Sequence, residues 1–203
     1  MTGETQSEMQ VKVRFLLIMM ALFASAHFVP AHAQDPPPPP PAKDYFPRTW
    51  DEYSFPAGKF RVRFPQKPVE STSTQGGLTV NWVEYKGLLT YRVSHVDFAT
   101  PIDDPQKVKE MLQGVKTAAL NAIRDKGPRI ISEREIDVDG HSGVFVHLEV
   151  GGKEVIRLQW VAAGSRLYTV SATSRKGSPK ELEGENDFER VALGFISSFH
   201  VLP

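Results

Sequence analysis

Histidine and carboxylate side chains are the residues of this 203-residue chain that could hold a metal ion. His95 and Asp97 are two positions apart, so in a strand their side chains would share one face. His147 falls in another run with strand character, which we expect in the same sheet. Imidazole and carboxylate groups that converge from neighbouring strands can ligate a divalent cation. His95, Asp97 and His147 are therefore candidate metal ligands, and a hydrogen-bonded surface pair is the alternative.

Catalytic chemistry finds less support in the sequence. Ser94, His95 and Asp97 contain the residue types of a hydrolase triad, but in a regular strand Ser94 points away from the other two. The chain has no cysteine, no histidine pair at the spacing of a zinc protease, no glycine-rich phosphate loop and no nucleophile elbow. We therefore predict that the protein is not an enzyme and has no cofactor.

An acidic run precedes the last predicted helix, with carboxylates at alternate positions. Its members are Glu181, Glu183, Glu185 and Asp187. Oxygen ligands of this kind could bind calcium weakly, but a solvated loop whose negative charge suits a helix N-terminus is the favoured interpretation.

Strands must position the candidate ligands. Residues 60–64 alternate apolar and basic side chains, which is the pattern of a strand with one buried face. Residues 78–86 and 88–98 follow a turn at Gly76-Gly77 and are expected to pair as an antiparallel hairpin. Four further strands, separated by glycine-containing turns, predict an antiparallel meander. They span residues 129–138, 143–150, 154–163 and 166–174.

Two helices should cover this sheet. The first begins at Asp104, a good N-cap that is followed by Pro105, carries an apolar stripe over about five turns and ends at Gly127-Pro128. The second runs from about Asn186 to Ser198. Its apolar side comprises Phe188, Val191, Ala192, Phe195, Ile196 and Phe199.

Composition and charge limit the class of protein. With 24 basic and 24 acidic residues, the chain lacks the basic excess of nucleic-acid or anionic-membrane binders. The absence of cysteine excludes disulfide scaffolds and thiolate zinc sites. Residues 45–203 have a uniform composition, and this length is sufficient for a single domain with a hydrophobic core.

The N-terminus resembles a secretory signal. Residues 1–33 combine a basic start, a 12-residue apolar run and Ala31-His32-Ala33 as a cleavage motif, whether translation starts at Met1 or Met9. A membrane anchor is the alternative, but spanning needs about 20 apolar residues. Cleavage would leave a neutral mature chain and no membrane span. Residues 34–44 are a proline-rich linker, expected to form a stiff polyproline stalk.

The mature chain resembles the Mog1/PsbP-like family, named for a Ran-binding protein and an extrinsic protein of photosystem II. The likeness rests on short segments at strand starts, turns and core positions. They are Tyr53–Pro65, Asp139–Gly143, Gly164–Tyr168 and Phe195–Phe199. The resemblance implies an accessory role in the lumenal branch of the family and protein binding in the nuclear branch.

The predicted fold is α+β: a three-layer α/β/α sandwich with a mostly antiparallel sheet of six or seven strands, a long helix after the first strands and a C-terminal helix. The function that we expect is an exported, non-catalytic accessory or protein-binding module of the periplasm or cell envelope, with a protein partner. The alternative is a small-ligand or divalent-metal-binding protein with its site on the sheet face or between helix and sheet.

Overall fold

The computed structural model describes residues 50–75, 77–152, 154–174 and 185–203, without the side chains of residues 75 and 185–189. The predicted signal peptide (1–33) and the proline-rich linker (34–44) lie outside the described residues. So do Glu181 and Glu183 of the acidic run, and the side chains of its other members, Glu185 and Asp187, together with that of Phe188.

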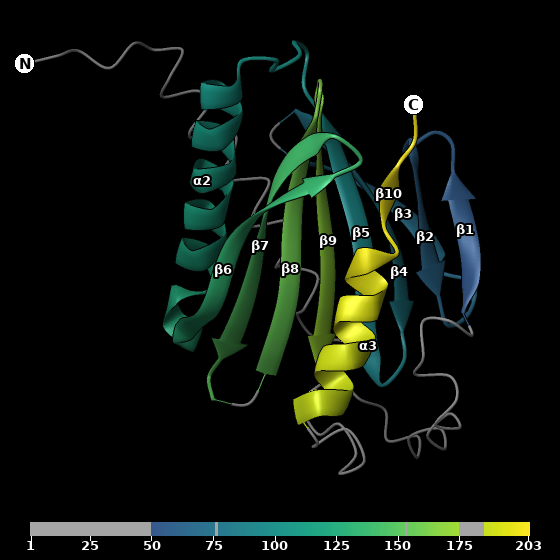
Figure 1. The fold of residues 1–203 in the computed structure, drawn as a ribbon, viewed down its shortest axis with the longest axis vertical. Coiled ribbons are helices and arrows are strands. Elements are labelled where there is room, and N and C mark those ends of the chain that lie inside the picture. The colour runs from purple at the N-terminus through teal and green to yellow at the C-terminus, as the bar shows by residue number, and fades with distance from the viewer. Residues whose placement is uncertain (1–49, 76, 153, 175–184) are drawn as a thin grey trace, which may run out of the picture.

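Seven antiparallel strands form the central sheet, in the order β3-β4-β5-β9-β8-β7-β6 (Figure 1). The strands are β3 (Val69–Gln75), β4 (Leu78–Lys86), β5 (Leu89–Asp97), β6 (Pro128–Val138), β7 (His141–Val150), β8 (Glu154–Ala163) and β9 (Arg166–Ser174). The predicted β4–β5 hairpin and the meander from β6 to β9 are both confirmed. The two halves of the sheet join where β5 pairs with β9.

Helix α2 (Pro105–Ala122) packs against one face of this sheet over β7 and β8 (Figure 1). Asp104 caps it as predicted, with its side chain accepting hydrogen bonds from the backbone N–H groups of Gln106 and Lys107. The α-helix ends earlier than the glycine, because a short 3₁₀ turn (Arg124–Lys126) follows it. Gly127 closes that turn in the left-handed region, with φ at 63°.

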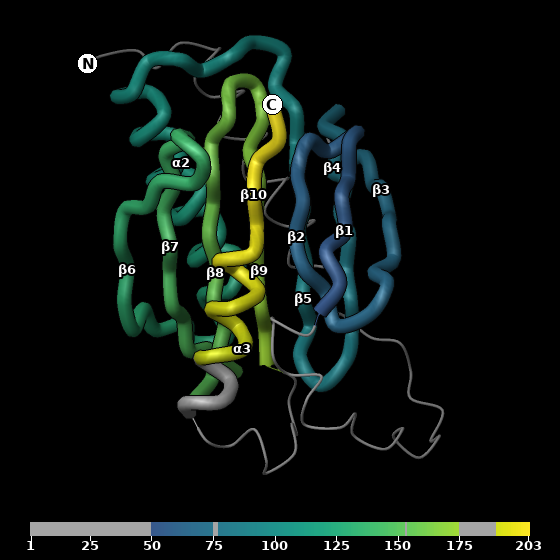
Figure 2. The backbone as a smooth tube through the Cα atoms, turned by 45° about the vertical axis from the view of Figure 1, so that its right-hand side comes forward, coloured from purple at the N-terminus to yellow at the C-terminus, as the bar shows by residue number. Residues whose placement is uncertain are grey.

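The opposite face is covered by two elements side by side: helix α3 (Glu185–Ser197) and a small antiparallel sheet (Figure 2). The small sheet has the order β1-β2-β10, with β1 (Asp51–Phe55), β2 (Phe60–Phe64) and β10 (His200–Val201). Of these strands only β2 was predicted, because β1 is largely exposed and β10 is too short to have a period. The β1–β2 turn is the part of this layer that matters for the site.

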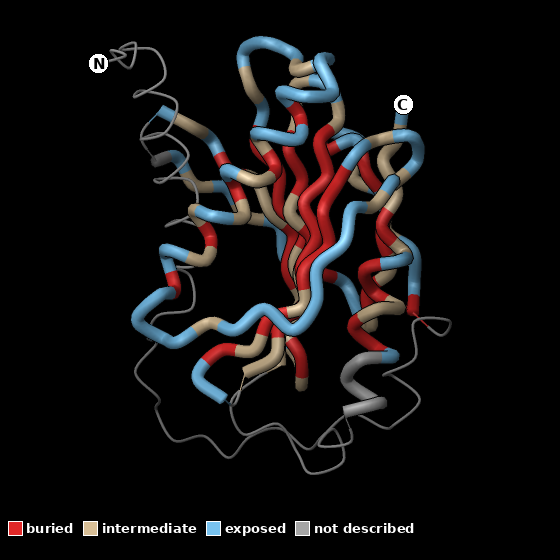
Figure 3. Tube along the Cα trace, turned by 60° about the vertical axis from the view of Figure 1, so that its left-hand side comes forward, coloured by how far each residue is buried: buried red, intermediate tan, exposed pale blue. Residues whose placement is uncertain are grey.

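Two separate apolar cores lie on the two faces of the central sheet, whose middle strands are the most buried part of the chain (Figure 3). One core contains the α2 stripe, and the other contains buried residues of α3 and the aromatic side chains of β2. The three-layer α+β fold is therefore confirmed, and the third layer is part helix and part sheet. The face of β8 that carries Arg157 and Gln159 is covered too, since both residues are buried.

Candidate functional site

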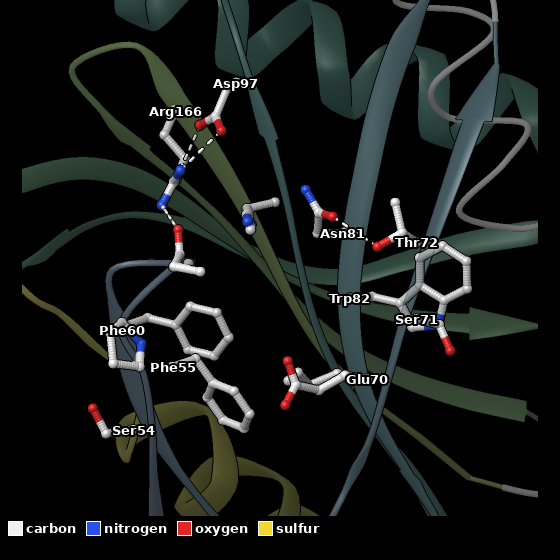
Figure 4. Close-up of a pocket in the computed structure, with 15 residues that line it drawn as sticks. Ser54, Phe55, Phe60, Glu70, Ser71, Thr72, Asn81, Trp82, Asp97 and Arg166 are labelled. Atoms are coloured by element: carbon white, nitrogen blue, oxygen red, sulfur yellow. Dashed lines mark hydrogen bonds and ion pairs between the residues drawn. The ribbon is translucent and has the colours of Figure 1, made fainter.

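A pocket of about 520 Å³ opens between the β1–β2 turn and the neighbouring face of β3, β4 and β5 (Figure 4). Both walls end in strands that lie at the edge of their sheets, β1 and β3. The residues that line it are Ser54, Phe55, Pro56, Ala57, Gly58, Phe60, Glu70, Ser71, Thr72, Asn81, Trp82, Val83, His95, Asp97 and Arg166. Two layers of the fold therefore contribute to a single site.

An ion pair between Arg166 and Asp97 closes one end of the pocket. The two residues face each other in the β5–β9 register, and Nη2 of Arg166 donates to Oδ2 of Asp97 at 2.8 Å while Nε donates to Oδ1. The hydrogen bond from Arg166 holds the pKa of the Asp97 carboxyl below its usual value. Nη1 of Arg166 also donates to the backbone carbonyl of Ala57 at 3.2 Å. The ion pair thus attaches the β1–β2 turn to the central sheet.

Tyr168 fixes the same turn at a second point. Its buried hydroxyl donates to the carbonyl oxygens of Gly58 at 2.8 Å and Lys59 at 3.1 Å. A side chain at position 58 would not fit, because a Cβ there would lie 2.5 Å from the buried ring of Phe60. The turn wall of the pocket is therefore held in place before any ligand arrives.

His95 lines the pocket between these two contacts. The residue is 7% exposed, and its ring lies against the rings of Phe60 and Tyr168, with centroids 6.3 and 6.2 Å away. Its Nδ1 atom is buried and has no hydrogen-bond partner among the described residues. Burial, followed by the nearby Arg166 charge, lowers the pKa of His95 to about 4. The imidazole is therefore neutral at pH 7.

A polar row crosses the sheet at the level of His95. Thr72, Asn81, His95 and Tyr168 are direct cross-strand partners on β3, β4, β5 and β9. Thr72 Oγ1 donates to Asn81 Oδ1 at 2.9 Å. The far wall of the pocket is thus polar, whereas the turn wall presents the stacked rings of Phe55 and Phe60, 4.8 Å apart.

The structure brings together two of the three metal candidates. His95 and Asp97 line one pocket, but His147 lies on β7, separated from β5 by β9 and β8. Three strand spacings correspond to about 14 Å, which is beyond the reach of a shared metal ion. No group of three or more His, Asp or Glu side chains that could hold a metal occurs within the described ranges. Ser94 lies on the other face of β5, where it pairs with Trp82, as strand geometry predicts.

Several site residues were missed as functional candidates. Arg166 and Tyr168 belong to the Gly164–Tyr168 segment, and Phe55, Gly58 and Phe60 belong to the Tyr53–Pro65 segment. In the sequence, both segments were interpreted only as turns and core positions. These two segments are the feature of the sequence from which the site residues could have been predicted. Thr72 and Asn81 had none, because nothing local distinguishes them from other polar strand residues.

The comparisons with known proteins identify the fold. No family model matches the sequence, and no curated protein sequence matches it. Among solved structures, the cyanobacterial PsbP protein CyanoP from Synechocystis matches with a TM-score of 0.51 and 14% identity, over 74% of this chain and 91% of that one. The chain thus has a Mog1/PsbP-like fold. At that identity the match speaks for the fold alone.

Two weaker matches add no argument. A Bacteroides thetaiotaomicron protein has a TM-score of 0.37 and 13% identity, over 76% of this chain and 49% of its own. PA94, a Pseudomonas aeruginosa protein of unknown function, has a TM-score of 0.35 and 13% identity, over 66% of this chain and 88% of its own.

In the part of the chain that the structure describes, neither helix is both long and apolar enough to cross a membrane.

Proposed function

We propose that the protein is an exported, non-catalytic accessory module of the periplasm or cell envelope, and that it binds a partner protein through the pocket between β1 and β3. The observation that carries this proposal is a pocket of about 520 Å³ whose turn wall is fixed by Arg166 and Tyr168. Binding sites for small ligands commonly have volumes of about 300 to 1,000 Å³, so the space is sufficient for one or two side chains of a partner.

A protein segment suits this pocket because two edge strands line it. β1 and β3 are the ends of their sheets, and unpaired strand edges are where an extended segment can add by backbone hydrogen bonding. Val69 of β3 is 68% exposed beside the same edge. Export is proposed from the signal-like residues 1–33, and the neutral overall charge favours a protein over a nucleic acid.

Site-specific cross-linking tests this proposal. A photoreactive benzoylphenylalanine replaces Thr72 at the pocket in the full-length chain, and in a matched control it replaces exposed Glu135 on β6, at the far edge of the sheet. We expect a discrete cross-linked protein in the envelope fraction from position 72 and not from position 135. Equal products from both positions, or none from position 72, would contradict the proposal.

A small-ligand site is the second candidate, favoured by the same volume. A divalent metal is less supported, because Asp97 already accepts two hydrogen bonds from Arg166 and His147 is remote. Native mass spectrometry and metal analysis of the protein purified after export distinguish these cases. A stoichiometric small molecule or metal would favour the second candidate.

A further inference from the structure

We infer that the group bound in the pocket is a positively charged side chain, a lysine or arginine on an extended segment of the partner. This inference rests on the proposed function and adds the chemistry of the contact. It follows from which hydrogen-bonding groups of the pocket are already used and which are left to a ligand.

The cationic side chain of the pocket lining is already engaged. The guanidinium of Arg166 donates twice to Asp97 and once to the carbonyl of Ala57, and its side chain is only 15% exposed. The imidazole of His95 is uncharged at neutral pH. An anionic ligand would therefore find no free cation here and would meet two carboxylates.

The acceptors, by contrast, are available. The Asp97 side chain is 52% exposed although it is paired, so part of its carboxylate still faces solvent. Glu70 lines the same sheet wall from β3, is exposed, and makes no ion pair with any described residue. With one guanidinium against two carboxylates, the lining has a carboxylate in excess.

His95 supplies an independent observation. Its Nδ1 is a buried polar atom without a partner among the described residues, in a ring that lines the pocket. Such an atom destabilises a folded protein and is rare unless something else bonds to it. Nε2 of the same ring is not closed off in this way. In the tautomer with its proton on Nδ1, Nε2 accepts a hydrogen bond from a ligand that brings donors.

The apolar wall suits the stem of such a side chain. Phe55 and Phe60 stack on one another, and Pro56 extends this wall. Lysine and arginine bury their methylene stems along apolar surface while the charged end reaches polar groups, and aromatic faces attract cations. Aromatic rings at one wall and carboxylates at the other therefore fit a basic side chain.

Peptide titration tests this inference on the protein purified after export. The probes are three capped pentapeptides of alternating Thr and Val with a central lysine, Nε-acetyl-lysine or glutamate, and amide chemical shifts report where each one binds. We expect the lysine peptide to shift pocket residues and to bind at least about fivefold more tightly than the acetylated one, the difference expected from one charge-assisted hydrogen bond. The glutamate peptide should not bind.

Two variants locate the charge. Glu70→Gln should weaken the lysine peptide about fivefold, and Glu135→Gln, an exposed carboxylate on β6, should leave its affinity unchanged. Equal binding of the acetylated or glutamate peptide at the pocket would overturn the ligand class and leave the proposed function standing. Absence of pocket shifts with every peptide would overturn the inference, and the cross-link from position 72 then decides the proposed function separately.

Discussion

His95 occupies a position where an apolar side chain would serve folding better. The residue is 7% exposed, it packs against two aromatic rings, and its Nδ1 is unpartnered among the described residues. Replacing a buried unpaired polar group with an apolar one of similar volume is neutral or stabilising. We therefore treat His95 as a residue retained for what the pocket binds.

His95→Leu should make the isolated protein more stable and the ligand weaker. At pH 7 we expect the free energy of unfolding to rise by about 1 kcal/mol, because the unpaired nitrogen is removed. Urea denaturation measures the stability, and the lysine peptide titration measures the loss of affinity. A clear loss of stability would mean that Nδ1 has a partner, and unchanged affinity would remove His95 from the binding account.

The same variant should change how stability depends on pH. The pKa of His95 is about 4 in the folded protein, against an ordinary value of 6.5, because burial and the Arg166 charge outweigh Asp97. Between these values the unfolded chain takes up a proton that the folded chain refuses, so stability is lost as the pH falls. The advantage of His95→Leu should grow from pH 6.5 to pH 4, by up to about 1.4 kcal/mol per pH unit. A constant difference would contradict this.

Residue types alone could predict only part of the site. Two positions along a strand do share a face, so His95 and Asp97 were correctly placed together. His147 was expected to join them because the sequence indicated a common sheet, but the sequence does not count the strands between. β9 and β8 separate the two histidines. The partner of Asp97 is Arg166, 69 positions away, and local pattern cannot reach that far.

Helix starts and hairpin turns were predicted correctly, because residues close together in the sequence determine them. Asp104 and Pro105 mark the start of α2, and glycine turns mark the hairpins. The small sheet was missed because its strands exist through packing: β10 has two residues and pairs with β2 from the far end of the chain. Which strand of the meander docks beside β5 was not predicted, and the structure shows that it is β9.

The β1–β2 turn is the element on which the pocket most depends. Tyr168→Phe removes the hydroxyl that donates to the carbonyls of Gly58 and Lys59, and should lower the free energy of unfolding by about 1–2 kcal/mol. Hydrogen exchange at the Lys59 amide, which bonds to Pro56, should quicken. Tyr53→Phe is the matched control, since no described residue bonds to its hydroxyl. Equal effects of the two variants would mean that the turn does not need this contact.

We predict that the mature protein has lost residues 1–33 and carries no net charge. Cleavage after Ala33 removes two basic and two acidic residues, so 22 of each remain. We expect the protein recovered from the periplasm of an expressing bacterium to begin at Gln34, whether translation starts at Met1 or Met9. Intact mass and N-terminal sequencing measure this. A chain that keeps residues 1–33 would show that they act as an anchor and not as a cleaved signal.

The fold of this chain does not by itself determine what the pocket binds. The arrangement of strands and helices places the chain with CyanoP at a TM-score of 0.51, and the segments that carry the likeness are turns and core positions. One of those segments, Tyr53–Pro65, forms one wall of the pocket. In our proposal, what the pocket binds is set by Glu70, His95 and Asp97, and of these three Asp97 also supports the fold through its ion pair with Arg166.

Competition for the pocket is the decisive test of whether a basic segment of the partner binds there. The purified chain with benzoylphenylalanine at position 72 is irradiated in envelope extract with saturating lysine peptide or with its acetylated counterpart. If a basic segment of the partner occupies the pocket, the lysine peptide should suppress the cross-linked product while the acetylated peptide leaves most of it. A cross-link whose yield is the same with either peptide and without any peptide would contradict the account.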